Sequence, residues 1–172
     1  NASPAEKLAM NNALAENTQI SEAVDQSYKV LSNIRNNPFN EMEYSVPAST
    51  SAECVREILK TIYDEAIDVA FPLEYRYVSP EDPWLSMAYG EEPHATISIH
   101  RSAFEDYKPY FNRIEPIFRK YGGRPHWGKV HSLGHNELNE LYPRFSDFKE
   151  IRNNPELIDN LVIEQDLSLI HI

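Results

Sequence analysis

Apolar residues recur every three to four positions along residues 4–36, the spacing that places side chains on one face of a helix. The most regular run is formed by Ile20, Val24, Tyr28, Leu31 and Ile34. We predict two helices here, with a break near residues 17–18 and an end at the Asn-Asn-Pro sequence of residues 36–38, because proline cannot continue a helix. The apolar stripe is more typical of packing within the protein than of binding a partner.

Alternation of apolar and polar residues predicts three strands further along the chain. They cover residues 41–46, 69–79 and 95–100. Pro72 indicates that the second strand lies at an edge or contains a bulge, because proline has no N–H group to donate to a neighbouring strand.

Two of these strands carry polar side chains on one face. Glu74 and Arg76 are two residues apart and so leave their strand on the same side. The third strand has a polar face formed by Thr96, Ser98 and His100. A shift in register by one residue would place Ile97 and Ile99 there instead, and both registers stay open at this point.

Two longer helices are predicted to follow capping boxes, in which a hydroxyl and a glutamate three residues later satisfy free N–H groups. One box is Thr50 to Glu53 and the other is Ser102 to Glu105. The second helix should end at Gly122-Gly123, which favour a left-handed stop. Shorter helices are expected at residues 136–142 and 145–152.

The stretch Gly-Arg-Pro-His-Trp-Gly-Lys-Val-His, residues 123–131, gathers several residue types that bind ligands. Pro125 biases Arg124 toward an extended conformation, so we predict a loop that leads into a short strand. In that strand, one face would be formed by Trp127, Lys129 and His131.

The order of these elements is strand, helix, strand, strand, helix, strand, joined by short turns. It is typical of an α+β protein with a mostly antiparallel sheet and helices packed on one face. A chain of 172 residues is long enough to form one domain with its own core.

Composition narrows the possible partners. Sixteen basic against twenty-seven acidic residues give a formal charge of −11, which disfavours nucleic acid. No apolar run is long enough for a membrane span and no export signal is visible, so we expect a cytoplasmic protein. Cys54 is the only cysteine. In the first turn of a helix its thiol pKa could be lowered, but without a base nearby we favour a half-buried structural cysteine.

The pair Glu74 and Arg76 is the first candidate for ligand binding. On a strand the two side chains lie about 7 Å apart, so a small polar molecule could bridge them. A carboxylate accepts from hydroxyl groups and a guanidinium donates to oxygen, which suits a polyol. The alternative is a surface ion pair that does little.

A metal site is the weaker alternative. His131 and His135 are four residues apart, but Leu133-Gly134 interrupts the helix that would align them, so no metal is expected. The sequence also contains no glycine-rich dinucleotide motif, no P-loop and no hydrolase elbow.

Four segments together carry a family resemblance. They are Asn-Glu-Met-Glu-Tyr-Ser-Val-Pro at 40–47, Glu-Tyr-Arg at 74–76, Trp-Leu-Ser at 84–86 and Arg-Pro-His-Trp-Gly-Lys at 124–129. In this order they resemble the C-terminal half of the FAD-dependent sugar-lactone and alditol oxidases, within the vanillyl-alcohol oxidase superfamily. The resemblance covers residues 39 to about 152. It implies that residues 39–172 form the substrate (cap) domain and that the FAD-binding domain of the same polypeptide is absent, whereas the pattern of apolar residues alone assigns residues 1–38 as a helical segment of the same domain.

The resemblance also implies roles for individual residues. Arg76 and Lys129 would be catalytic, on a sugar-lactone or polyol substrate that gives hydride to FAD. The residues implied to bind substrate are Glu74, Ser98, His100 and His126. Arg124 and Trp127 are implied to contact FAD, which the missing domain would mainly hold, although each has a purely structural alternative. A separate possibility is a standalone sugar-binding or interaction module without redox activity. The sequence after residue 152 departs from the family pattern.

Overall fold

The computed structural model describes residues 38–154, together with residues 3, 5, 6, 9, 26 and 29. The helices predicted within residues 4–36 therefore lie almost entirely outside the described residues. The same holds for the assignment of residues 1–38 as a helical segment and for the segment after residue 154.

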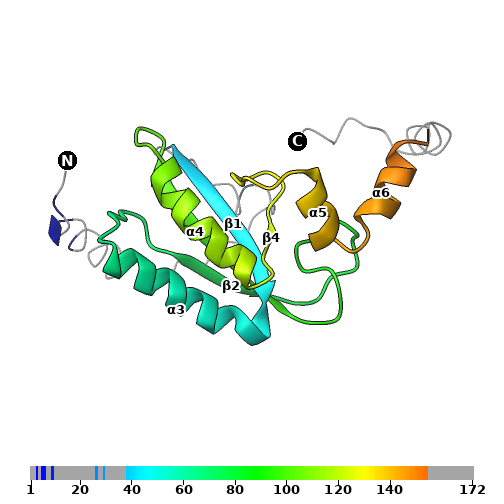
Figure 1. The fold of residues 1–172 in the computed structure, drawn as a ribbon, viewed down its shortest axis with the longest axis horizontal. Coiled ribbons are helices and arrows are strands. Elements are labelled where there is room, and N and C mark those ends of the chain that lie inside the picture. Colours follow the sequence, from blue (N-terminus) through cyan, green and yellow to red (C-terminus); the bar gives the residue numbers. More distant parts are fainter. Residues whose placement is uncertain are drawn as a thin grey trace.

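The described chain is built on an antiparallel sheet, shown in Figure 1. Its strands are β1 (Phe39–Pro47), β2 (Glu74–Val78), β3 (His94–Ser102) and β4 (Arg124–Pro125). They lie in the order β2-β3-β1-β4, and every neighbouring pair is antiparallel. The predicted α+β class with a mostly antiparallel sheet is confirmed.

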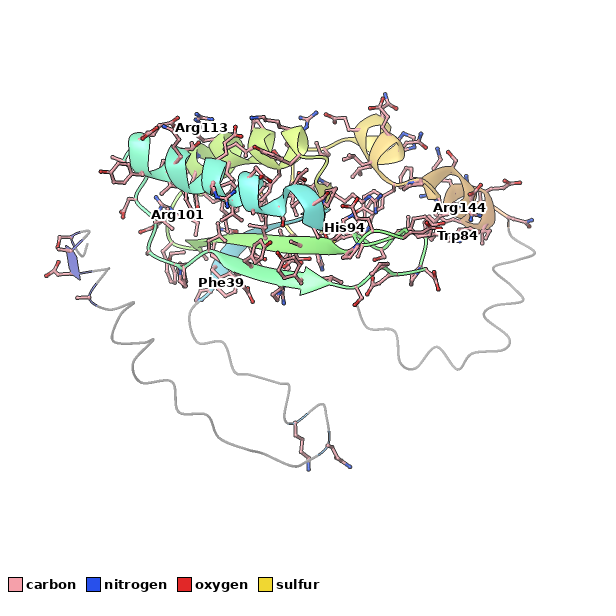
Figure 2. All side chains as sticks on the ribbon, turned by 90° about the horizontal axis from the view of Figure 1, so that it is seen from below. Phe39, Trp84, His94, Arg101, Arg113 and Arg144 are labelled. Carbon is pink, nitrogen blue, oxygen red and sulfur yellow. The ribbon has the colours of Figure 1, made fainter. Side chains whose placement is uncertain are left out.

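Helices cover one face of this sheet. Figure 2 shows α3 (Ala48–Asp64) and α4 (Lys108–Lys120) lying above the strands, while none of the described helices covers the opposite face. The shorter helices α5 (His135–Leu141) and α6 (Phe145–Arg152) follow beyond β4. Among the described residues, no helix has both the length and the apolarity required to cross a membrane.

The core lies between the sheet and the two long helices because the apolar residues of each strand share that side. Tyr44 of β1 is fully buried and stacks on Phe118 of α4, with ring centroids 4.9 Å apart. Ile97 and Ile99 of β3 also face this core, so the alternation that places Ser98 and His100 on the opposite face is the correct one. The polar residues of β1, β2 and β3 are thereby left on the face that none of the described helices covers.

The predicted strand at residues 69–79 was too long. β2 begins only at Glu74, two residues after Pro72, and Phe71 lies in the irregular segment that precedes it. Since Pro72 has no N–H group, the ladder with β3 starts after it.

Both predicted capping boxes were wrong. α3 begins at Ala48, directly after Pro47, so Thr50 lies within the first turn and its hydroxyl donates to the Pro47 carbonyl instead of capping the helix. At the other box β3 continues to Ser102, and a turn follows before α4 begins at Lys108. The first helix thus begins earlier than its predicted cap, and the second begins later because β3 extends past its predicted end.

The predicted glycine stop after α4 is present, and its two glycines have different reasons. Gly122 has a φ of +70°, the left-handed conformation that glycine adopts easily. At Gly123, a Cβ would lie 2.8 Å from the carbonyl oxygen of Phe118 and 3.1 Å from the ring of Tyr44. Only glycine allows the chain to pass so close to the core here.

Cys54 is fully buried on α3, past the first turn in which it was predicted. Burial, together with the charge of Glu57, raises the pKa of its thiol to about 12. The cysteine is fully buried where a half-buried one was predicted, and its raised thiol pKa favours a structural role over an activated thiol.

Candidate substrate-binding site

The sheet face that is left uncovered by the helices within residues 38–154 carries a continuous set of polar side chains, which we call the polar face. Register explains it: Glu41 pairs with His100, and Ser98 is flanked by Glu43 on β1 and Glu74 on β2. Residues directly opposite each other in an antiparallel pair point to the same side. The polar face consists of Glu41, Glu43, Ser45, Glu74, Arg76, Thr96, Ser98 and His100.

Arg76 is held on this face by two carboxylates. Its Nη2 donates to Oε2 of Glu43 at 3.1 Å, and its Nε lies 3.8 Å from Oε1 of Glu74. The same Glu43 oxygen also accepts from the hydroxyl of Ser98 at 2.8 Å. The Glu43 side chain is only 8% exposed, whereas that of Arg76 is 54% exposed. The guanidinium is thus held in place by these carboxylates, and it is still accessible to a ligand.

Lys129 is held in the same way at the other end of the polar face. Its Nζ donates to Oε2 of Glu41, and Nε2 of His100 lies 3.5 Å from the other oxygen of that carboxylate. Burial raises the pKa of Glu41, but the hydrogen bond and charge of Lys129, with the charge of His100, outweigh it and leave the pKa below its usual value. Glu41 is therefore a buried anion that positions a lysine.

The residues around Arg76 and those around Lys129 meet at Glu74 and His100. Ligand atoms of Glu41, Glu74 and His100 all lie within 4.8 Å of one another. Arg76 contacts Glu74 of this cluster and Lys129 contacts Glu41, and their action on a common ligand stays a prediction. A metal ion at the cluster would have to compete with Lys129 for Glu41. His131 and His135, the pair suggested by the sequence, are not part of this cluster, and His135 instead contacts Asn136 and Lys149.

A loop insertion explains how Lys129 reaches this position. The N–H of His126 donates to the carbonyl of Glu43, and the N–H of Val130 donates to that of Glu41, both at 2.9 Å. These donors are four residues apart while their acceptors are two apart, so two extra residues loop out from the edge of β1. The predicted strand carrying Trp127, Lys129 and His131 on one face was therefore wrong.

His126 and Trp127 stabilise this loop. Nδ1 of His126 accepts from the N–H of Gly128 at 3.0 Å and closes the turn. The indole N–H of Trp127 donates to the carbonyl of Leu85 at 2.9 Å, and its ring stacks on Phe145 of α6. Trp127 remains 39% exposed, so part of its ring surface can still contact another molecule.

Arg124 has a bracing role. It pairs with Ser45, at the end of the polar face away from Glu41 and Lys129. Its guanidinium donates to the carbonyls of Tyr89 at 2.7 Å and Leu141 at 3.0 Å. A third, longer bond goes to the carbonyl of Met87 at 3.4 Å. These bonds tie the segment between β2 and β3 to the end of α5. Contact with flavin stays a prediction for Arg124 and for Trp127.

Sequence reasoning did not single out several residues of the site. Glu41 and Glu43 lie in a segment that carried the family resemblance, and their alternation with Met42 and Tyr44 was the available signal. His94 lies further along the same face of β3 than Thr96, which the sequence had placed on this face, and burial lowers the pKa of His94. These side chains extend the polar face beyond the predicted residues.

The fold and this site define a class: an α+β module that presents two tethered cations, hydroxyl groups and carboxylates on the sheet face opposite its described helices. Such donors and acceptors match a neutral molecule with several oxygen atoms.

Comparison with known proteins agrees with this class. A sequence profile of the D-arabinono-1,4-lactone oxidase family matches residues 3–156. The chain therefore belongs to that family.

Curated relatives bear related names. An L-gulono-1,4-lactone dehydrogenase of Mycobacterium tuberculosis is 35% identical over 143 residues, which is 83% of this chain and 33% of that protein. The alditol oxidase of a Streptomyces strain is 28% identical over 64% of this chain and 26% of its own length. The L-gulonolactone oxidase of Mus musculus is 27% identical over 76% and 31%. The chain thus spans about a third of the length of the curated relatives it matches.

Proposed function

We propose that this chain is the substrate-binding cap portion of an FAD-dependent oxidoreductase that oxidises a sugar lactone or an alditol. The observation that carries the proposal is the convergence of Arg76 and Lys129 on one cluster, each tethered by a buried glutamate of β1. Membership of the lactone oxidase family supports it, as do the names of the relatives.

The two cations define the position of the reacting hydroxyl. Oxidation of an alcohol removes hydride from carbon and a proton from oxygen, so negative charge develops on that oxygen. Arg76 and Lys129 stabilise this charge, and they are fixed in advance because Glu43 and Glu41 hold them. Glu74 accepts a hydrogen bond from a neighbouring hydroxyl, which orients the carbon to be oxidised.

Flavin, when bound, supplies the acceptor for the hydride. The polar face is open on the side without described helices, so a planar cofactor can lie against it. Trp127 offers exposed ring surface at one edge, while the donors of Arg124 are already engaged by loop carbonyls. Because the chain spans about a third of the length of the curated relatives it matches, we propose that an FAD-binding domain of the same polypeptide holds most of the cofactor.

The proposal is tested on the purified product of the full reading frame. Its absorbance spectrum is recorded before and after anaerobic addition of a panel of aldonolactones and alditols. We expect a flavin band that bleaches with one substrate class. A protein without flavin would favour a module that binds sugars without redox activity.

A further inference from the structure

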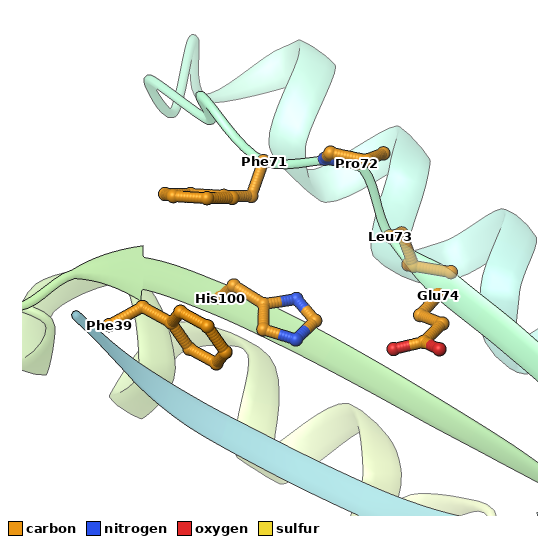
Figure 3. A pocket seen from close by; sticks show the side chains of 6 residues that line it. All are labelled: Phe39, Phe71, Pro72, Leu73, Glu74 and His100. Atoms are coloured by element: carbon orange, nitrogen blue, oxygen red, sulfur yellow. The ribbon is translucent and has the colours of Figure 1, made fainter. Parts of the chain in front are cut away.

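A mostly apolar pocket adjoins the polar face. It has a volume of about 230 Å³ and is lined by Phe39, Phe71, Pro72, Leu73, Glu74 and His100. Figure 3 shows the rings of Phe39 and Phe71 around the imidazole of His100, with the Glu74 carboxylate at one side. The ring centroids of Phe39 and Phe71 lie 5.2 Å and 6.3 Å from that of His100.

Glu74 and His100 belong to both the pocket and the polar face. A ligand held by the polar face can therefore extend past these two residues into the pocket without leaving the surface. Beyond them the walls are two phenylalanine rings, a leucine and a proline, which offer no side-chain donor or acceptor. The pocket is smaller than the usual 300–1,000 Å³ or so of a complete ligand site, so it suits one end of a ligand.

We propose that this pocket is a specificity subsite for an apolar end of the substrate, such as an alkyl or deoxygenated carbon chain. The inference rests on the proposed function, since it requires the reacting hydroxyl to lie near Arg76 and Lys129. A hydroxyl group pushed against Phe39 and Phe71 would lose its water without gaining a partner, whereas a methylene group would gain from burial. The substrate then carries hydroxyl groups at the reacting end and few at the far end.

The direct test is binding to this chain, which does not depend on flavin. Hexane-1,2-diol and a hexitol have the same carbon chain length and differ in the polarity of the four carbons furthest from the reacting end. Each is titrated at millimolar concentration while the ring signals of Phe39, Phe71 and His100 are followed by NMR. We expect the diol to shift these signals at a concentration at least about tenfold lower than the hexitol.

Phe71→Ala should weaken binding of the diol by about tenfold and change hexitol binding little. Phe104→Ala is the matched control, because Phe104 is 86% exposed and does not line the pocket. Thermal unfolding of both variants is measured alongside, and Phe71→Leu replaces the alanine variant if that one does not fold. Equal binding of the two probes, or an equal loss for both in the Phe71 variant, would overturn the proposal.

Turnover by the full-length product separates this inference from the proposed function. Preference for the hexitol over the diol, with flavin reduced by both, would leave the oxidoreductase assignment intact and refute the apolar subsite. Binding of the diol at these rings without flavin reduction by any alcohol would support the pocket and contradict the enzyme.

Discussion

Lys129 and Glu41 form an ion pair between a looped-out segment and the sheet, 88 positions apart in the sequence. The Glu41 side chain is 9% exposed and that of Lys129 is 28% exposed. Because the carboxylate is buried and also faces His100, it fixes where the ammonium group lies. This pair and the matching pair of Arg76 with Glu43 give the polar face its two positioned cations.

Removing the carboxylate of Glu41 should release Lys129. For Glu41→Gln we expect the free energy of unfolding at neutral pH to fall by about 1–3 kcal/mol, since the hydrogen bonds to a charged group are lost. Chemical denaturation measures this. Glu53→Gln is the control, because Glu53 is exposed and lies 3.8 Å from Arg56 in a surface pair that should contribute little.

The same pair predicts a pH dependence of stability. The pKa of Glu41 lies below the usual 4.5 because Lys129 and His100 outweigh the opposing effect of burial. A carboxyl group with a lowered pKa in the folded state stabilises the protein above its unfolded pKa, and this contribution is lost as the pH falls through the folded value. The melting temperature of the wild type should therefore fall more steeply below pH 4.5 than that of Glu41→Gln. Parallel curves for the two proteins would contradict the lowered pKa.

Both tethered cations, Arg76 and Lys129, should be required for turnover if the proposed function holds. In the full-length product we expect Lys129→Met and Arg76→Ala each to lower kcat by about 10²–10³, the usual effect of removing a donor to a developing oxyanion. Lys60→Met is the matched control, since Lys60 lies on α3, away from the polar face. Retained turnover in both site variants would remove these residues from the mechanism.

The close approach at Gly123 predicts a packing effect that is independent of function. Gly123→Ala should destabilise the chain by about 1–3 kcal/mol, because the new methyl group would lie against the Phe118 carbonyl and the Tyr44 ring. Gly134→Ala is the comparison, since its methyl group would be 3.6 Å from the nearest atom. That change should stay within about 0.5 kcal/mol, and both are measured by denaturation.

Much of the fold could be predicted because local pattern determines it. The alternation around Tyr44 indicated which face of its strand is buried, and the spacing of Glu74 and Arg76 placed both on one side of theirs. For Ile97 the sequence left two registers open, and only the packing of the core selects one. The predicted substrate residues of β2 and β3 lie together for this reason.

The rest depended on contacts between distant segments. The bond from Arg76 to Glu43 depends on the order of the strands in the sheet, which periodicity does not reveal. The position of Lys129 depends on two extra residues that loop out between His126 and Val130, beside β1, and periodicity does not reveal these either. The start of α4 was missed because β3 extends to Ser102, where pairing with β1 outweighed the local capping signal. The start of α3 was missed because the helix begins directly after Pro47, before the predicted cap at Thr50.

The measurement that tests the account most directly is anaerobic reduction of flavin in the full-length product, in the wild type and in Lys129→Met. We predict that the wild-type flavin band bleaches with an aldonolactone or an alditol and that the variant binds flavin but is reduced at least about a hundredfold more slowly. A wild-type protein that binds no flavin, or a variant reduced at the wild-type rate, would contradict the assignment of this face as the substrate site of an oxidoreductase.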